Sequence, residues 1–215
     1  MLSAAAIVDL HDELTSAWHT PEGQGTVDDA SDDRHPASAA TGDFLARVAR
    51  QHRANFDLWH IEDEARAPGA SDAALADVKR RIDATNQRRN DLAEDLDRVL
   101  MEWLEAKDLP KADALLHSES PGLMIDRLSI QALKIYHTRE ESERPGAPAG
   151  HDERNRDRLA ILMEQRADLA ACLDALWRDT LSGTRRFKLY RQLKMYNDPS
   201  LNPAIYGKGG CESKG

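Results

Sequence analysis

The sequence holds few of the residues and motifs that identify the commonest kinds of active site. Its 215 residues include only two cysteines, so the chain can form at most one disulfide bridge and carries no cysteine-based zinc motif. Cys172 falls within a helical leucine pattern, which predicts a buried thiol, and Cys211 lies in a tail of Gly, Lys and Ser. A nucleophile elbow, a phosphate-binding loop and a dinucleotide-binding fingerprint are also absent, which argues against the enzyme classes that they mark.

Aromatic residues are scarce, at 5% of the sequence, and so are β-branched residues. Ala, Leu, Arg, Asp and Glu dominate instead, which is a composition typical of helices. No apolar run approaches the ~20 residues that a membrane-spanning helix needs. The first residues also lack the basic segment that begins an export signal. We therefore expect an all-α protein of the cytoplasm.

Positive charge is in deficit, and the formal net charge is −9. Affinity for nucleic acids depends largely on cationic side chains that neutralise phosphates, so an acidic chain is a poor general binder of DNA or RNA. Anionic membrane surfaces would repel it for the same reason. We expect neither nucleic acid nor membrane among its partners.

Apolar residues recur at helical spacing along most of the chain, which predicts one elongated helical bundle over residues 1–206. The longest helix would extend for roughly 50 Å, at 1.5 Å per residue. The prediction comprises a first helix over 3–19, a flexible loop or insert over 20–40, four main helices over 41–66, 71–107, 121–143 and 152–182, a short connecting helix over 111–117, an ordered C-terminal arm up to 206 and a disordered tail over 207–215.

One face of the helix predicted over 41–66 changes character along its length. It is apolar as far as Trp59, and the same stripe then continues into Asp63 and Arg66, with Glu62 at its edge. Since the stripe does not rotate away, we expect these charged side chains to point into the bundle rather than to solvent.

Polar residues interrupt the core faces of the next two main helices as well, which predicts a polar cleft between three helices. Bundle proteins build metal and substrate sites from side chains on facing helices. The candidate catalytic residues are Glu62, Asp63, Glu94, Asp126 and His137, and the candidate ligand-binding residues are Trp59, His60, Arg66, Asn86, Arg89, Asn90, Arg127, Lys134, Lys194 and Tyr196.

The residue types in this cleft suit several kinds of chemistry. Carboxylates one helical turn apart could hold a divalent metal such as Mg²⁺ or Mn²⁺, or orient a water molecule. The arginines could bind a phosphate, and His60 and His137 are candidate general bases, since imidazole titrates near neutral pH. The opposing interpretation is that these residues form solvated helix faces or a structural network of ion pairs.

The segment over 185–194 is strongly basic in an otherwise acidic protein, and aromatic residues alternate with its cations. It could close over the cleft and capture an anionic ligand. The alternation also fits an amphipathic segment that packs against the bundle, with its aromatic residues as anchors.

Four blocks of sequence together resemble a known family. They are NFDLWHIEDEAR at 55–66, KRRIDATNQRRNDLAEDLD at 79–97, PGLMIDRLSIQALKIYH at 121–137 and KMYNDPSLNPAIY at 194–206. They resemble a bacterial family known only as domain of unknown function 4254, over residues 5–206 apart from the insert. The resemblance implies a helical fold and carries no catalytic residues, although members are often encoded near glycosyltransferases of envelope polysaccharide synthesis. Gln131 departs from the unbroken apolar run that is usual at that point of the family.

Two hypotheses of function follow from the residues and the resemblance. In the first, the cleft binds or processes a phosphorylated small molecule, such as a nucleotide sugar, in the biosynthesis of envelope glycans. In the second, the protein is a non-catalytic interaction module, an accessory to a glycosyltransferase. The sequence alone does not choose between an enzyme and a binding protein.

Overall fold

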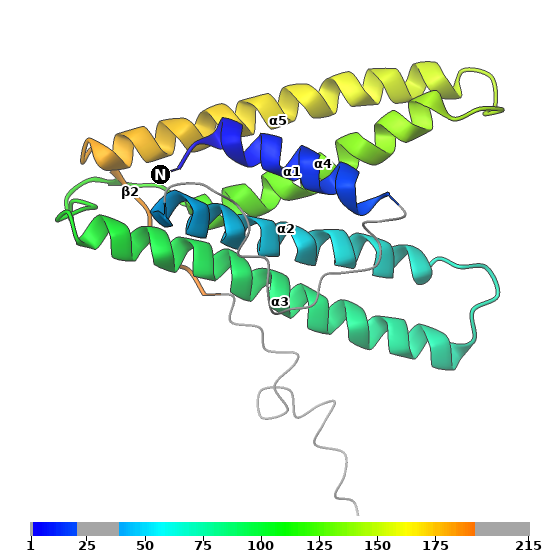
Figure 1. Ribbon diagram of the computed structural model, residues 1–215, viewed down its shortest axis with the longest axis horizontal. Coiled ribbons are helices and arrows are strands. Elements are labelled where there is room, and N and C mark those ends of the chain that lie inside the picture. Colours follow the sequence, from blue (N-terminus) through cyan, green and yellow to red (C-terminus); the bar gives the residue numbers. More distant parts are fainter. Residues whose placement is uncertain (1, 21–38, 192–215) are drawn as a thin grey trace, which may run out of the picture.

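Five helices dominate the computed structural model, which describes residues 2–20 and 39–191. The all-α class that the composition predicts is confirmed. Helices α2 and α3 pair as one helical hairpin, α4 and α5 pair as a second, and α1 lies across the two (Figure 1). The helices span Ala4–Trp18 (α1), Ala39–Glu64 (α2), Asp72–Glu105 (α3), Pro121–Glu143 (α4) and His151–Leu181 (α5).

Serine side chains begin three of these helices. Ser3, Ser71 and Ser120 precede α1, α3 and α4, and each side chain accepts a hydrogen bond from the backbone N–H three residues later. Such a cap stabilises a helix by about 1 kcal/mol, because it satisfies a donor that has no partner within the helix. The helix starts are therefore encoded locally, which explains why spacing and capping signals locate them well.

The connecting segment after α3 differs from its prediction. A short helix was expected over 111–117, but Leu115–Leu116 form strand β1, which pairs in parallel with strand β2 at Arg185–Arg186. The N–H of Leu115 donates to the carbonyl of Thr184 at 3.2 Å. A helix of two turns is marginal in water, so pairing with a segment distant in sequence prevails here.

The main hydrophobic core draws side chains from all five helices, among them Ile7, Val48, Leu100, Leu128 and Leu173. A second, smaller cluster comprises Trp18, Phe56 and Leu133 from α1, α2 and α4. α1 is therefore a full member of the core rather than an appendage to four main helices.

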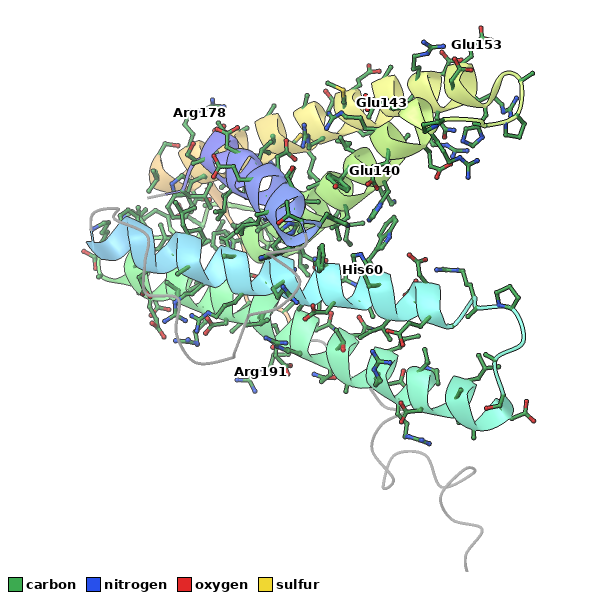
Figure 2. All side chains as sticks on the ribbon, turned by 45° about the vertical axis from the view of Figure 1, so that its right-hand side comes forward. His60, Glu140, Glu143, Glu153, Arg178 and Arg191 are labelled. Atoms are coloured by element: carbon green, nitrogen blue, oxygen red, sulfur yellow. The ribbon has the colours of Figure 1, made fainter. Side chains whose placement is uncertain are left out.

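The described part of the basic arm packs against the bundle. Phe187, directly after β2, is buried in the main core. Arg191, the last described residue of the arm, lies on the opposite side of the α2–α3 pair from His60 (Figure 2). The described part of the arm therefore does not reach over His60. Lys194 and Tyr196, predicted to bind a ligand, lie outside the described residues.

Two further observations concern the surface. Cys172 is exposed on α5 rather than buried, and it lines an open groove between α4 and α5. Among the helices of the described residues, none combines the length and the hydrophobicity that a membrane span needs.

Candidate metal centre

The charged residues predicted at the end of α2 lie near its surface, which corrects the sequence-based expectation. The side chains of Glu62, Asp63 and Arg66 are 46%, 60% and 66% exposed, and Arg66 pairs with both acids along its own helix. The helical phase was correct, but no helix covers the stripe beyond Trp59, because α1 ends and α4 diverges from α2 toward that end of the bundle (Figure 1). Glu62 alone of the three lines a cavity.

Two predicted cations of α4 are also at the surface. Arg127 is exposed and pairs with Glu119 at 2.9 Å, and Lys134 is exposed. The expectation that they face an enclosed cleft is therefore wrong, because both side chains are exposed to solvent. On α3, Asn86, Asn90 and Glu94 are half-buried.

The structure does bring Arg89 and Asp126 together. Arg89 Nε donates to Asp126 Oδ1 at 2.8 Å, and Arg89 Nη2 donates to Oδ2 at 2.5 Å. Gln51 and Asn55 donate to the same carboxylate from α2, at 2.6 and 2.9 Å. Asp126 thus has four donors, and the pair raises the pKa of Arg89 above its ordinary value. This cluster joins α2, α3 and α4 through a satisfied ion pair.

A cavity of about 190 Å³ lies beside this ion pair, between α2, α3 and α4. Three residues predicted for ligand binding or catalysis, Trp59, Glu62 and Arg89, line it together with Asn55. The remaining walls are apolar: Leu58, Ile130 and Leu133.

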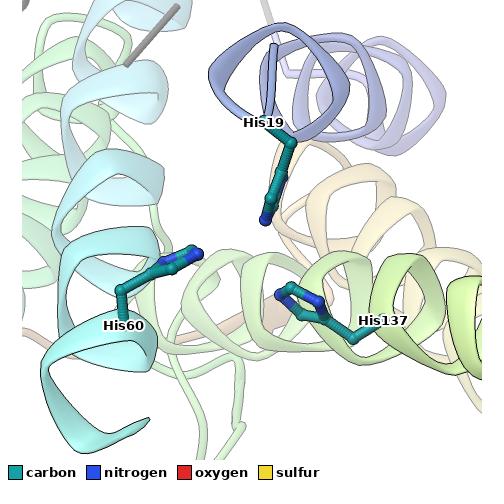
Figure 3. Close-up of side chains that lie close together, drawn as sticks. All are labelled: His19, His60 and His137. Atoms are coloured by element: carbon teal, nitrogen blue, oxygen red, sulfur yellow. The ribbon is translucent and has the colours of Figure 1, made fainter. Parts of the chain in front are cut away.

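Three histidines from three helices converge at one point of the fold. His19 lies at the C-terminal end of α1, His60 on α2 and His137 on α4, and their rings face one another (Figure 3). One ring nitrogen of each lies within 4.8 Å of the corresponding nitrogens of the other two. All three side chains are half-buried.

Hydrogen bonds fix the tautomer of each ring. Nδ1 of His19 bonds to the carbonyl oxygen of Thr15 at 2.7 Å, and Nδ1 of His60 to that of Phe56 at 2.8 Å. Nδ1 of His137 bonds to the Glu140 carboxylate at 3.0 Å. Because a carbonyl or carboxylate oxygen can only accept, Nδ1 carries the proton in every case. In its neutral form, a ring bonded in this way offers the lone pair of Nε2 as a metal ligand.

Two of these nitrogens, Nε2 of His19 and of His137, are buried and have no hydrogen-bond partner among the described residues. A buried polar atom without a partner is unfavourable and rare in native proteins. Metal-binding histidines commonly donate their other N–H to a carbonyl or carboxylate, which orients the ring, and that is the arrangement of all three rings here.

Aromatic side chains enclose the cluster. Tyr136 stacks on the ring of His19 with 4.2 Å between centroids, and Trp59 stacks on that of His137 at 4.9 Å. The ring of Phe56 lies 4.3 Å from that of His60. Burial lowers the pKa of His19, and the neighbouring histidines lower it further, so this ring is held neutral and able to bind a metal.

The donor set fits a particular class of ion. Imidazole nitrogen suits zinc, copper, nickel and cobalt, whereas Mg²⁺ and Mn²⁺ prefer oxygen ligands. Around a tetrahedral zinc ion the ligand nitrogens lie ~2.0–2.1 Å from the metal and about 3.3 Å from one another. The three ring nitrogens here lie within 4.8 Å of one another. His19 also lies at the negative end of the α1 dipole, which favours a cation.

Sequence reasoning found two of the three residues. His60 and His137 were predicted to take part in a site, but with carboxylates rather than with each other. His19 was missed, because it follows the last apolar residue of α1 by one position and no spacing motif links it to the other two. The one local signal was that His19 ends the first predicted helix.

Comparison with known proteins adds one finding to this geometry. A family model described as "Protein of unknown function (DUF4254)" matches residues 45–189, which confirms the resemblance seen in the sequence. No curated protein and no solved structure gives a significant match. The matched span contains His60 and His137, while His19 precedes it.

Proposed function

The chain belongs to the DUF4254 family, whose description names no activity, and we propose that it is a metalloprotein that holds one divalent transition-metal ion through His19, His60 and His137. One observation carries this proposal. All three rings are protonated on Nδ1 by their hydrogen bonds and direct Nε2 to a common point. Nε2 of His19 and of His137 is buried without a hydrogen-bond partner among the described residues, and a bound ion would satisfy both atoms.

Three protein ligands leave a coordination position open, as in catalytic zinc sites, where water or substrate takes the fourth position. An anionic oxygen is the natural occupant, since imidazole binds a metal in its neutral form and leaves the charge of the ion uncompensated. This modifies the sequence-based hypothesis of a phosphorylated ligand. Two N–H groups of Arg89, on Nε and Nη2, already donate hydrogen bonds to Asp126. The metal rather than that arginine would therefore bind the phosphoryl group.

The neighbouring cavity provides room for the rest of such a ligand. Trp59 belongs to both features, because it stacks on His137 and lines the cavity. Leu133, another wall residue, lies one helical turn before His137 on α4. A small organic group could therefore pack against Trp59 while its oxygen reaches the ion.

Calorimetric titration of the purified chain with Zn²⁺ or Co²⁺ tests the proposal. We expect one ion per chain and a loss of affinity of at least about 100-fold in His60→Ala and in His137→Ala, because each removes a ligand. His117→Ala is the matched control: this half-buried histidine also bonds through Nδ1 to a backbone carbonyl, that of Glu119, but lies outside the cluster. Binding that survives both ligand substitutions, or that is equally weakened by the control, would disprove the site.

A further inference from the structure

A layer of buried polar residues lies beneath the histidine cluster, on the same three helices. Thr15 of α1, His52 of α2 and Ser129 of α4 form it, and all three side chains are at most 1% exposed. Nε2 of His52 hydrogen-bonds the Thr15 hydroxyl at 2.9 Å, and Nδ1 of His52 hydrogen-bonds the Ser129 hydroxyl at 2.7 Å. One imidazole thus ties three helices together.

This layer is in register with the proposed metal ligands. Thr15 precedes His19 by four residues, which is about one helical turn. His52 precedes His60, and Ser129 precedes His137, by eight residues each, about two turns. Around the helix axis, Thr15 is therefore offset by about 40° from its ligand and His52 and Ser129 by about 80° from theirs, so each pair lies within one quarter of its helix.

The space between the two layers is filled by the smaller hydrophobic cluster, Trp18, Phe56 and Leu133. Each of these residues comes from one of the three helices and lies between the polar residue and the histidine of that helix. The stack is thus hydrogen-bonded at its base, apolar in its middle and metal-binding at its top.

Thr15 connects base and top directly. Its hydroxyl bonds His52, and its backbone carbonyl accepts the Nδ1–H of His19. Ser129 is held in turn by Asn55, which donates to its hydroxyl at 2.9 Å and to Asp126 at 2.9 Å. The base of the stack is thereby anchored to the Arg89–Asp126 ion pair.

We propose that Thr15, His52 and Ser129 are positioning residues for the metal centre, and that their hydrogen bonds set the registers of α1, α2 and α4 so that the three ligands converge. The inference rests on the proposed metal site. Apolar packing alone tolerates shifts and repacking, because contacts between methyl groups are not directional. Hydrogen bonds of 2.7–2.9 Å hold a fixed geometry, and metal centres lose function when their ligands are displaced by as little as about 1 Å.

Thr15→Val tests this directly, because valine keeps the shape of threonine and leaves the carbonyl that holds His19 in place. We expect Co²⁺ affinity to fall by at least about tenfold, the effect of losing a residue that orients a ligand, and the visible absorption bands of bound Co²⁺ to change with the coordination geometry. Thr15→Ser restores the hydroxyl and should restore both. Ser129→Ala, at the other side of His52, provides a second and milder disruption.

Thr180→Val is the matched control. Thr180 is fully buried too, and its hydroxyl donates to the carbonyl of Leu176 on α5, a helix without a ligand. Unchanged Co²⁺ affinity and spectrum in Thr15→Val and Ser129→Ala would overturn the positioning role, as would an equal loss in Thr180→Val. A native chain that binds neither Co²⁺ nor Zn²⁺ would instead refute the metal centre itself, so the two failures are distinguishable.

Discussion

Asp97 of α3 accepts a hydrogen bond from the backbone N–H of Gly122 in the first turn of α4, at 2.6 Å. The same carboxylate accepts one from the hydroxyl of Ser120, the N-cap of that helix. The helices touch here without room for a side chain: a Cβ at Gly122 would lie 2.3 Å from the carbonyl oxygen of Ala93. The start of α4 is thus fixed by α3, and α4 carries His137, Asp126 and Ser129.

Gly122→Ala should therefore destabilise the protein. The new methyl group would meet a backbone oxygen that cannot rotate away, so α3 and α4 must separate, at a cost of about 2–4 kcal/mol. Urea unfolding measures it. Gly146→Ala separates this clash from the general effects of removing a glycine: its φ of 73° strains alanine, but a Cβ there meets no atom within 4 Å. A loss at Gly122 no larger than that at Gly146 would contradict the close contact.

Acid should destabilise the protein through His52 and His11. Burial lowers the pKa of His52 to about 3, and burial together with His52 and Arg166 lowers that of His11. Both rings stay neutral when folded, whereas the unfolded chain takes up protons below pH 6.5. The contribution of His52 is therefore complete above pH 6.5 and is lost as the pH falls toward 3, by about 1.4 kcal/mol per pH unit, and His11 adds to the loss in the same direction. Urea unfolding from pH 4 to 7 should show this slope, and His52→Gln should reduce it.

Asp97 opposes that trend over part of the same range. Burial raises its pKa from 3.8 to about 6, so the folded chain holds this proton more tightly than the unfolded chain. Its contribution is present below pH 3.8 and is lost as the pH rises to 6. Asp97→Asn removes the effect, so the variant should gain about 2–3 kcal/mol relative to the native chain between pH 4 and 7. A pH-independent difference between the two would show that Asp97 keeps an ordinary pKa.

Arg89→Met should be strongly destabilising, by about 3 kcal/mol, because it leaves the buried carboxylate of Asp126 without its cation. Gln51 and Asn55 still donate to that carboxylate, which limits the loss. Arg81→Met is the matched control, since its pair with Glu64 is exposed and screened by solvent and should contribute much less. Equal losses in the two variants would mean that the pair does not specify how α2, α3 and α4 dock.

Local signals in the sequence account for much of the fold. Two local signals, a serine cap at the start of a helix and apolar residues at helical spacing, locate the helix ends to within a few residues. Both effects act within a turn or two of the helix. The pairing of Leu115–Leu116 with Arg185–Arg186 could not be foreseen, since it joins segments about 70 residues apart and neither has a strand-like pattern. The spacing of apolar residues describes one helix at a time and does not predict contacts between distant segments.

The candidate site shows the same division. Helical phase correctly placed Asp126 and Arg89 toward neighbouring helices, but the burial that it predicted for Asp63 and Arg66 was wrong, since both are exposed. Phase gives the direction of a side chain but not whether a second helix extends far enough to cover it. His19 was missed for a related reason: its partners are set by how α1 crosses α2 and α4, which is a property of the packed bundle.

The three ligands are widely separated along the chain, with 41 residues from His19 to His60 and 77 from His60 to His137. An ion bound to all three would close two large loops, and cross-links over long loops restrict the unfolded chain most. The described residues contain a single thiol, so no disulfide among them can do the same. The concentration of the ion, rather than the redox state of the surroundings, would then determine how strongly α1 is held to the two helical hairpins.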